Sequence, residues 1–472
     1  MSQNSFATLS AALDWLFANT NYEQVKTFRY NTRTFNLDRT FQVLEILGNP
    51  HLAYPTVHIA GTKGKGSTSA MTACLLQAAG LHHVGLYTSP HLMKLEERIA
   101  VNFEPIAEDD LRDCISAARG PIESVTERGP EMKPTFFEIF TIIGFLHFAR
   151  KRVDAAVIEV GLGGRLDATN CVQPIVTGIT PISYDHTAVL GETLDLIARE
   201  KAGIVKSGIP LVVGKQEPEA FSAIAEVAQE KQSRLYAFDR DYCLSESPFG
   251  LGCCSGLQSP VSSLASCRPP EEFAVETPYT RYEQLNLRLL GGHQRRNAAM
   301  ALTMSELACN VLGVPLPPAA ARERLANLDW PGRVELFSVN PPIVIDAAHN
   351  GASAEALVAA LEERFTGRKA VVILAIAAHK DQLRVIDALA RIAREFVVTT
   401  IDSPRSEVAD ELAANVRAKV SVPVHVEPSR PAALALGRKL ANSDLLVITG
   451  SFYLAGELRQ LLLSERASDQ RL

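Results

Sequence analysis

The sequence predicts an α/β protein of two units, each a mainly parallel β-sheet covered by helices. Short apolar runs rich in β-branched residues alternate with helical patterns along most of the chain, which is typical of strand–helix–strand crossovers. The chain has 472 residues, more than one hydrophobic core usually supports. A second alternating series begins after Trp330-Pro331-Gly332. We therefore expect a larger domain over residues 1–328 and a smaller one over residues 329–472.

The expected elements follow from the spacing of apolar residues, because strands alternate every second residue and helices bury one face. In the first unit, strands are predicted at 56–60, 84–87, 155–160, 175–180 and 209–213. Helices are predicted there at 9–18, 37–47, 68–79, 137–150, 193–204, 220–229 and 297–312. In the second unit, strands are predicted at 343–346, 370–376, 396–400 and 445–449, and helices at 352–363 and 381–394.

Composition excludes several classes of protein. The chain is 47% hydrophobic and 21% charged, which is ordinary for a globular protein. Its net charge of −6 and pI of about 6.0 argue against nucleic acid or an anionic membrane surface as a partner. No signal-like start and no apolar run long enough to span a bilayer is evident. We expect a cytoplasmic protein.

One cysteine-rich stretch departs from the alternating pattern. Residues 241–270 are rich in Ser, Pro, Gly and Cys, and they predict a long loop or insertion. Zinc could be considered for its four cysteines, which are Cys243, Cys253, Cys254 and Cys267. Their irregular gaps do not match zinc-ligand spacing, so we favour incidental thiols. Eight cysteines in so long a chain also do not indicate a disulfide framework.

A glycine-rich turn after the strand 56–60 is the strongest functional signal. Glycines at 61, 64 and 66 let the backbone turn its amides toward an anion, and the following helix adds its N-terminal dipole. Lys65 would reach the outer phosphates of a nucleotide, and Ser67 or Thr68 could bind a phosphate or its Mg²⁺. The usual spacing is not met literally, because Gly66 separates Lys65 from Ser67. A bland glycine turn would seldom carry two lysines and three hydroxyls before a helix, so we favour nucleotide binding.

Polar side chains also follow other predicted strands of the first unit. Ser89 comes after strand 84–87, Glu159 lies near the end of 155–160, and His186 follows 175–180. Parallel α/β sheets bind ligands at the carboxyl ends of their strands. A buried carboxylate such as Glu159 is costly without a metal or strong donors. We therefore expect these residues near the glycine-rich turn.

Each of these residues also has an interpretation without a ligand. Ser89 can belong to an ordinary surface loop, Glu159 can pair with Arg165, and a lone histidine such as His186 is more often structural. Lys201 ends the predicted helix 193–204, and it can be a surface charge. The residues alone leave these alternatives open.

A further group of polar residues lies in the second unit and in the helix that precedes it. Asn297 begins the helix 297–312, Arg333 stands at the start of the unit, and Ser451 follows its last strand. Asp346 ends the predicted strand 343–346, which is taken as the first strand of that unit, and His349 follows it. Polar clusters at strand ends in both units predict one site between the two domains.

The motifs together resemble one known family. The chain is similar to folylpolyglutamate synthases and bifunctional dihydrofolate synthases/folylpolyglutamate synthases of the Mur ligase superfamily. The matching motifs occur in family order from about residue 55 to 455 and are GTKGKGST, YTSPHL…ERI, PTFFE, EVGLGGRLDATN, DH, EKAGI, HQ..NA, WPGR, DAAHN and TGSFY. The family usually has DGAHN, so Ala347 replaces a glycine. The cysteine-rich stretch is not part of the family pattern.

The resemblance implies a parallel-sheet P-loop ATPase domain followed by a smaller Rossmann-like α/β domain, with ATP and Mg²⁺ as cofactors. By similarity, the ATP-binding residues are Gly64, Lys65, Gly66, Ser67, Asn297, Arg333 and Asp346. Those matching Mg²⁺ ligands are Ser89, Glu159 and His186. Lys65, Asp346, His349 and Ser451 match positions tied to catalysis, and Lys201 matches a lysine that family members carbamylate. The residues matching the pterin-side pocket are Thr135, Phe136, Phe137, Glu138, Leu166, Asp167 and Ala168.

The implied reaction is ATP-driven amide formation. L-glutamate would be joined to a folate or dihydropteroate carboxylate through an acyl phosphate, with small molecules as the only partners and a monomer as the expected state. A peptidoglycan-type Mur ligase would normally carry a further N-terminal domain. A P-loop kinase or regulatory NTPase is the alternative from another class, and a non-enzymatic nucleotide-binding scaffold is a third. Neither of these would need the second α/β unit with its Asp346 and His349.

Overall fold

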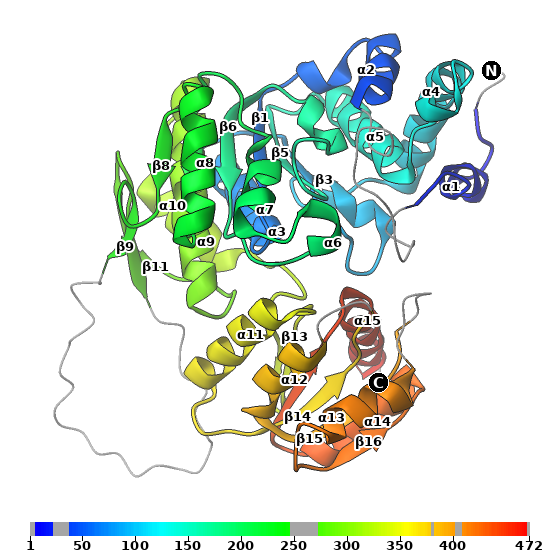
Figure 1. Ribbon diagram of the computed structural model, residues 1–472, viewed down its shortest axis with the longest axis vertical. Coiled ribbons are helices and arrows are strands. Elements are labelled where there is room, and N and C mark those ends of the chain that lie inside the picture. Colours follow the sequence, from blue (N-terminus) through cyan, green and yellow to red (C-terminus); the bar gives the residue numbers. More distant parts are fainter. Residues whose placement is uncertain (1–4, 22–36, 246–271, 379–381, 402–407, 470–472) are drawn as a thin grey trace. The chain divides into compact units, whose positions relative to one another are not determined.

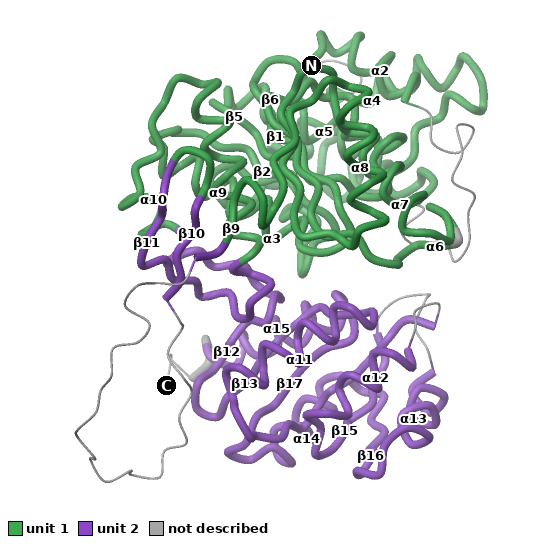
Figure 2. Tube along the Cα trace, turned by 60° about the vertical axis from the view of Figure 1, so that its left-hand side comes forward, with its two compact units in different colours: residues 1–243, 277–279, 296–324 green, residues 244–276, 280–295, 325–472 purple. Residues whose placement is uncertain are grey.

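A computed structural model describes residues 5–21, 37–245, 272–378, 382–401 and 408–469. The chain groups into two compact units, coloured separately in Figure 2. Unit 1 comprises Met1–Cys243, Thr277–Tyr279 and Arg296–Arg324, and unit 2 comprises Leu244–Glu276, Thr280–Arg295 and Leu325–Leu472. Each unit has its own sheet, as the two apolar series in the sequence predict.

Unit 1 contains an eight-stranded sheet of order β4-β3-β2-β5-β1-β6-β7-β8. Its strands are β1 Thr56–Ala60, β2 Val84–Tyr87, β3 Ile99–Val101, β4 Glu104–Pro105, β5 Ala155–Glu159, β6 Pro174–Ile179, β7 Leu211–Val213 and β8 Leu235–Ala237. The central strand β1 pairs in parallel with β5 and β6. At one edge of the sheet, β3 is antiparallel to β2, and β4 is antiparallel to β3. These two short strands were not predicted. Because β1 lies at the centre, the turn that follows it is flanked by the ends of β5 and β6.

Helices cover both faces of this sheet (Figure 1). They are α1 Leu9–Phe17, α2 Leu37–Ile46, α3 Lys65–Ala78, α4 Glu108–Thr126, α5 Phe136–Lys151, α6 Thr187–Leu190, α7 Leu194–Ala202, α8 Pro218–Glu230, α9 Gly292–Leu312 and α10 Pro318–Asn327. Ile158 of β5 packs in one cluster with α1, α2, α4 and α5. Gly178 of β6 lies on the other face, where an added Cβ would come within 2.6 Å of Met304 on α9. Short 3₁₀ helices occur at η1 Pro50–Leu52, η2 Leu95–Arg98, η3 Pro130–Met132 and η4 Ala168–Cys171.

A small three-stranded sheet has the order β11-β10-β9, with β9 Cys243–Ser245, β10 Phe273–Glu276 and β11 Arg281–Leu285. The prediction of a loop over 241–270 is therefore wrong at its start, because β9 pairs with a strand distant in sequence. Cys243 lies on β9. Cys253, Cys254 and Cys267, together with the rest of that stretch from residue 246, lie outside the described residues.

Unit 2 contains a six-stranded sheet of order β12-β13-β17-β14-β15-β16. Its strands are β12 Glu335–Val339, β13 Pro342–Ile345, β14 Ala370–Leu374, β15 Ala393–Val398, β16 Val424–Val426 and β17 Leu445–Thr449, and its helices are α11 Gly351–Arg364, α12 Gln382–Ala390, α13 Ala409–Arg417, α14 Arg430–Ala441 and α15 Phe452–Asp469. Only β12 of these strands is antiparallel to its neighbour. Asp346 therefore follows the second strand of the unit, and the prediction that it ends the first is wrong.

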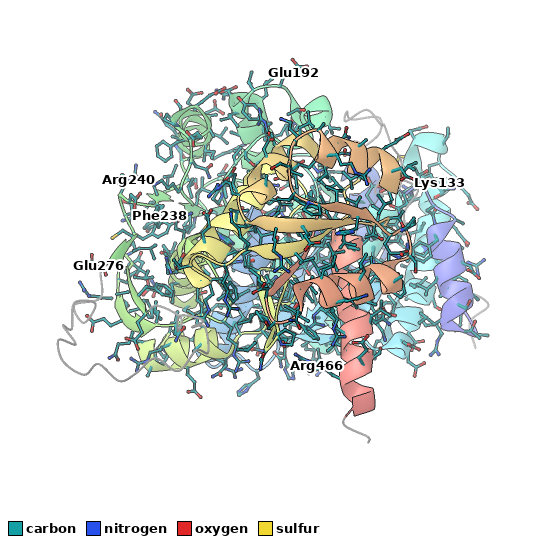
Figure 3. All side chains as sticks on the ribbon, turned by 90° about the horizontal axis from the view of Figure 1, so that it is seen from below. Lys133, Glu192, Phe238, Arg240, Glu276 and Arg466 are labelled. Carbon is teal, nitrogen blue, oxygen red and sulfur yellow. The ribbon has the colours of Figure 1, made fainter. Side chains whose placement is uncertain are left out.

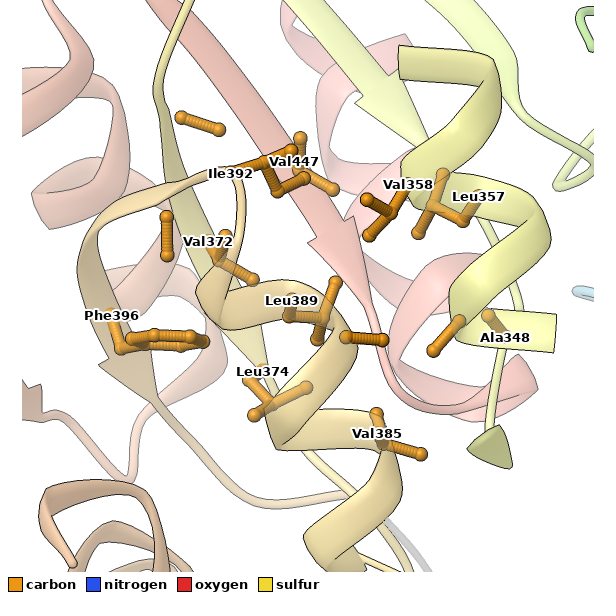
Figure 4. Packing of buried hydrophobic residues seen from close by; sticks show 14 of the residues in the cluster. Ala348, Leu357, Val358, Val372, Leu374, Val385, Leu389, Ile392, Phe396 and Val447 are labelled. Carbon is orange, nitrogen blue, oxygen red and sulfur yellow. The ribbon is translucent and has the colours of Figure 1, made fainter. Parts of the chain in front are cut away.

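The core of unit 2 lies between this sheet and helices α11 and α12. Figure 4 shows Val358 and Leu389 from these helices close to Val372 and Val447 of the sheet. On the opposite face, Ile373 approaches Gly437 of α14, where an added Cβ would be only 2.7 Å away. The alternation of neighbouring strand residues between the two faces is what the double-sided apolar pattern predicts.

Most predicted elements are confirmed within a few residues, and α3 begins at Lys65 rather than at residue 68. The prediction of a helix over 381–394 is wrong at its end, because α12 stops at Ala390 and β15 starts at Ala393. Helices α4, α6, α10, α13, α14 and α15 were not predicted. Helix α6 is only four residues long, and α4 contains Pro121, a residue that normally interrupts a helical pattern.

Charged side chains cover the outside of both units. Lys133, Glu192, Arg240 and Glu276 are exposed, and Figure 3 shows them at the periphery of the view. Among the residues that the structure describes, no helix is both long and apolar enough to cross a membrane.

Candidate active site

The glycine-rich turn between β1 and α3 requires glycine at two positions. Gly61 has φ +142°, and an added Cβ would lie 1.9 Å from Thr180 Oγ1. Gly64 has φ +84° and caps α3, and its added Cβ would lie 2.7 Å from Asn297 Oδ1. Side chains rarely adopt these conformations, and neither position has space for one. The structure thus places Asn297 of α9 against the turn, as predicted.

The first turn of α3 presents its backbone amides at this point. Lys65, Gly66 and Ser67 are the first three residues of the helix, so their N–H groups have no acceptor one turn earlier within it. Such a helix end attracts phosphate. The hydroxyl of Thr68 is buried, and within the described part of the chain it has no hydrogen-bond partner.

Lysine side chains converge on the turn. Lys65 Nζ donates a hydrogen bond to the Gly61 carbonyl oxygen at 3.2 Å, and Lys201 Nζ from α7 donates to the same oxygen at 2.9 Å. Lys63 Nζ pairs with Asp185 Oδ2 at 3.1 Å. Lys201 is only 5% exposed, which excludes the surface-charge alternative. Burial, with the charge of Lys65 next in importance, lowers the pKa of Lys201 to about 7.

Glu159 and Ser89 also meet near this turn. Glu159 is 4% exposed, and its Oε2 accepts a hydrogen bond from the Ser89 backbone N–H at 3.2 Å. Ile59 pairs with Glu159 across β1 and β5, so both side chains stand on the same face of the sheet, the face that packs against α3. A buried carboxylate oxygen beside a serine suits a hard divalent cation such as Mg²⁺. The donor chemistry therefore fits the metal that the sequence predicts.

His186 is placed differently from Glu159. It is exposed, has φ +54° and begins α6 as its N-cap. Its backbone N–H donates to Asp185 Oδ1 at 3.0 Å. Among the described residues, no three or more His, Cys, Asp or Glu side chains form a group that could hold a metal. The predicted ligand set contains only two residues of these types, so His186 as a metal ligand stays a prediction.

The loop of residues 161–170 follows β5 and contacts both α7 and α5. Arg165 N donates to the Glu200 carbonyl at 2.9 Å, and the Arg165 guanidinium pairs with the Glu200 carboxylate at 2.7 Å. An added Cβ at Gly164 would lie 2.8 Å from the Lys201 carbonyl oxygen, and one at Gly161 would lie 2.4 Å from the Phe137 ring. This loop therefore packs against the Phe137 ring at Gly161 and against the Lys201 backbone at Gly164.

The other predicted substrate residues carry structural contacts. Thr135 and Glu138 form a capping box at the start of α5, and Glu138 receives hydrogen bonds of 2.7 and 2.8 Å from Arg39. Burial raises the pKa of Glu138, which the Arg39 charge opposes. Phe136 stacks on Phe140 inside the same cluster. Leu166, Asp167 and Ala168 are buried as well. Their contact with a substrate stays a prediction.

Unit 2 gathers its predicted residues at the carboxyl ends of β13 and β17. Asp346 accepts hydrogen bonds of 2.8 Å from the backbone N–H groups of Val334 and Ala348. Burial raises the pKa of Asp346 to about 6, although these bonds and Arg333 act in the opposite direction. Val334 has φ +49°, a strained conformation for a β-branched residue. The Asp346 hydrogen bond helps to hold it.

One aromatic ring connects two predicted residues of unit 2. The Arg333 guanidinium lies 4.4 Å from the Phe452 ring centroid, and the His349 ring centroid lies 5.8 Å from it. His349 Nδ1 is 2.9 Å from the Ala347 carbonyl, which can only accept, so Nδ1 carries the proton. Ser451 Oγ accepts from Tyr453 N at 3.2 Å. Ala347 has no positive φ, so alanine fits there without backbone strain.

Sequence reasoning missed several residues of these two groups. Lys63 was counted only as a charge in the glycine turn, and its partner Asp185 was not given a role. Phe452 lies within the motif TGSFY, and that motif was the only signal that could have drawn attention to it. Thr180 and His58 carried no signal, because their contacts come from segments far away in sequence.

Comparison with known proteins gives one consistent family. The Mur ligase middle domain matches residues 59–305, and the Mur ligase glutamate ligase domain matches residues 332–452. The folylpolyglutamate synthase of Lacticaseibacillus casei is 34% identical over 447 residues, which cover 94% of this chain and 98% of that protein. The dihydrofolate synthase/folylpolyglutamate synthase of Bacillus subtilis (strain 168) is 32% identical over 94% of this chain and 99% of that protein.

A solved structure agrees with these sequence matches. The folylpolyglutamate synthase of Mycobacterium tuberculosis, complexed with ADP, has a TM-score of 0.84 and 29% identity to this chain. The match covers 96% of this chain and 98% of that one.

Proposed function

Because this chain belongs to the folylpolyglutamate synthase family of Mur ligases, we propose that it joins L-glutamate to the carboxylate of a folate or a dihydropteroate. The chain is an ATP-dependent, amide-forming ligase, and its products are the amide, ADP and phosphate. The observation that carries this proposal is the convergence of Lys65 and Lys201 on the Gly61 carbonyl, beside the start of α3. This arrangement can receive a triphosphate.

The reaction has two steps with balanced charges. A carboxylate oxygen of the acceptor substrate attacks the γ-phosphorus of ATP, which forms an acyl phosphate and releases ADP. The amino group of glutamate then attacks the acyl carbon, which forms the amide, releases phosphate and loses a proton. Two like charges about 4 Å apart repel by roughly 4 kcal/mol at an effective dielectric of 20. Cations near the triphosphate are therefore needed before the carboxylate can approach it.

The residues of unit 1 supply these cations and donors. The Lys65 ammonium group neutralises phosphate charge, and the amides of Gly64, Gly66 and Ser67 with the Asn297 side chain position the nucleotide. Mg²⁺ would be held by Ser89 and Glu159, with His186 as a further ligand, and when bound it supplies charge neutralisation at the phosphate oxygens. Supporting this placement, Glu159 is buried, and its Oε2 lies 3.2 Å from the backbone nitrogen of Ser89.

Lys201 acts in this proposal as a carbamate. Its neutral amine adds to CO₂, forming an N–C bond and releasing a proton, so the side chain becomes a carboxylate. The lowered pKa of Lys201, about 7, supports this step because a neutral amine is available near neutral pH. The carboxylate would serve a second divalent cation.

Unit 2 acts in the same reaction. Arg333 and Asp346 contact ATP, and His349 and Ser451 assist turnover. We assign residues 1–328 to the ATP-binding domain with the folate or pterin pocket, formed by Thr135–Glu138 and Leu166–Ala168, and residues 329–472 to the glutamate ligase domain. The close packing of Arg333 and His349 on Phe452 supports a shared role for these side chains. A cytoplasmic location and a monomeric state stay predictions.

An ADP-release assay tests the proposal. Dihydropteroate and tetrahydrofolate are supplied in parallel, each with and without L-glutamate. We expect sustained ADP release only when glutamate is present, and the substrate that supports it identifies the reaction. Equal ADP release without glutamate would favour the P-loop kinase or regulatory NTPase alternative.

A further inference from the structure

Three buried polar side chains connect β1 to the loop Gly161–Asn170. His58 on β1 and Thr169 are fully buried, and Asp167 is 4% exposed. His58 Nε2 lies 2.9 Å from Thr169 Oγ1, and Thr169 Oγ1 donates to Asp167 Oδ1. Buried polar groups are costly unless they are paired. The chain of contacts therefore links the strand before the P-loop to the predicted substrate pocket.

The donors and acceptors around Asp167 determine the direction of the hydrogen bonds between His58, Thr169 and Asp167. Asp167 also accepts from the backbone N–H groups of Leu162 and Thr169, at 2.9 and 3.0 Å. Burial raises the pKa of Asp167, whereas these backbone donors and the Thr169 hydroxyl act in the opposite direction. Because every neighbour that contacts the carboxyl oxygens is a donor, the ionised form satisfies them all, and the single Thr169 hydroxyl proton points to Asp167. Thr169 Oγ1 must then accept from His58, and the His58 proton lies on Nε2.

The rest of the His58 ring agrees with this assignment. Its Nδ1 is buried, and no hydrogen-bond partner is present among the described residues. Burial, with a smaller contribution from Lys206, lowers the pKa of His58 to about 3, so the ring is neutral. A neutral ring with its proton on Nε2 leaves an unprotonated Nδ1, which costs less to bury than an unpaired N–H donor on a charged imidazolium.

Asp167, the last of the three hydrogen-bonded side chains, determines the conformation of the loop. Asp167 caps η4 through Thr169 and holds the amide of Leu162. The adjacent Gly161 packs directly on the Phe137 ring, with no space for a side chain. A change in the direction of the Asp167 carboxylate would therefore move the loop against Phe137.

We propose that His58 is a positioning residue for the folate or dihydropteroate pocket, because its Nε2–H orients the Thr169 hydroxyl and thereby the Asp167 carboxylate that holds the loop. This inference rests on the proposed function, which assigns Phe137 and Asp167 to that pocket. His58 touches no substrate in this account, and its effect is on the acceptor substrate rather than on ATP.

Steady-state kinetics of four variants test the proposal. His58→Leu and Thr169→Val remove one link each, whereas His58→Gln retains a terminal N–H donor and Thr169→Ser retains the hydroxyl. We expect the first two to raise KM for the acceptor substrate by about tenfold, with KM for ATP within about twofold of wild type. The conservative variants should recover to within about threefold of wild type. His147→Leu, at a buried histidine whose ring packs against that of Phe148, is the matched control and should leave both KM values unchanged.

Two results would overturn the inference. Equal increases in KM for ATP and for the acceptor substrate would mean that His58 has no specific effect on the acceptor pocket. A ¹⁵N NMR spectrum of histidine-labelled protein, assigned with His58→Gln, should show the proton of His58 on Nε2, and a proton on Nδ1 would contradict the hydrogen-bond direction. If His58→Leu does not fold, the Thr169→Val and Thr169→Ser pair decides.

The proposed function can fail separately. Wild-type protein that releases no ADP with either acceptor and glutamate would contradict the ligase assignment, whatever the NMR spectrum shows. Wild-type activity together with unchanged acceptor KM in Thr169→Val would contradict only the role of His58.

Discussion

Lys201 Nζ donates a hydrogen bond to the carbonyl oxygen of Gly61 at 2.9 Å, which binds the end of α7 to the beginning of the P-loop. Lys65 donates to the same oxygen at 3.2 Å. Two ammonium groups on one carbonyl raise each other's electrostatic energy, and an anion placed between them would lower it. Burial, with the charge of Lys65 next in importance, lowers the pKa of Lys201 to about 7. The phosphate-binding and carbamate proposals both follow from this contact.

Replacement of Lys65 tests the phosphate-binding proposal. Lys65→Ala removes an ammonium group that the transferring phosphoryl group requires, so we expect kcat/KM to fall by at least about 10³-fold. The fold should persist, because Lys65 is only half-buried and its hydrogen bond to Gly61 is duplicated by Lys201. Lys133→Ala, at an exposed lysine, is the control and should behave as wild type. Wild-type-like ATP-dependent turnover in Lys65→Ala would remove the assignment.

Replacement of Lys201 by alanine tests the carbamate. We expect Lys201→Ala to lose most of its activity, because the added carboxylate is missing, and to regain part of it with millimolar acetate or propionate. Wild-type protein labelled with ¹³CO₂ should show a carbamate resonance that Lys201→Ala lacks. A fully active Lys201→Ala variant, or one that short carboxylates do not rescue, would count against carbamylation.

The pH dependence of stability tests the burial of Lys201. Its pKa falls from 10.5 to about 7 on folding, so between these values the unfolded chain binds more protons than the folded one. Stability therefore rises with pH across this window, and the cost at and below pH 7 reaches up to about 5 kcal/mol. Lys201→Met has no such group, but it loses a hydrogen bond worth about 1 kcal/mol. Under CO₂-free conditions we expect Lys201→Met to be the more stable at pH 6 to 7.

Urea unfolding at a series of pH values measures this difference. The advantage of Lys201→Met should shrink steadily as the pH rises from about 7 and should disappear somewhat below 10.5, the ordinary lysine pKa, where the remaining cost equals that of the lost hydrogen bond. A difference between wild type and Lys201→Met that does not change with pH would contradict a lowered pKa.

Replacement of Phe452 tests its contacts with Arg333 and His349. A cation over an aromatic ring gains about 0.5 to 2 kcal/mol, so Phe452→Leu should release Arg333 and raise KM for ATP by about threefold to tenfold. Phe452→Tyr keeps the ring face and should stay near wild type. Phe337→Leu is the matched control, because Arg466 stacks on Phe337 at 3.9 Å in the same unit. That control should lower the melting temperature without changing KM for ATP, and an equal KM change in both variants would point to general loosening of unit 2.

Local sequence predicted the elements that position the site. The strands β1, β5, β13 and β17 are short apolar runs whose residues are buried on both faces. The glycines at 61 and 64 predicted a tight turn. The structure shows why glycine is needed there: both residues have positive φ values, and neighbouring atoms leave no space for a side chain. These features depend on residues within one or two turns of each other, so a sequence displays them directly.

Competing local patterns explain the errors. Residues 381–394 continue an amphipathic helical spacing, but residues 393–398 pair with β14 and β16 as β15. β9 likewise exists because it pairs with β10 beyond a long intervening stretch. Strand pairing across such distances outweighs local propensity, and no window of neighbouring residues contains it.

The amino-acid order by itself determined the α/β class, the glycine-rich turn and the polar residues that follow each strand. The tertiary structure alone decided which of those residues are buried and what they contact. Lys201 and Gly61 are 140 positions apart, and only folding could turn an ambiguous lysine into a buried amine at the P-loop. The physical reason is that backbone conformation responds to near neighbours, whereas desolvation and charge depend on groups that the fold brings together.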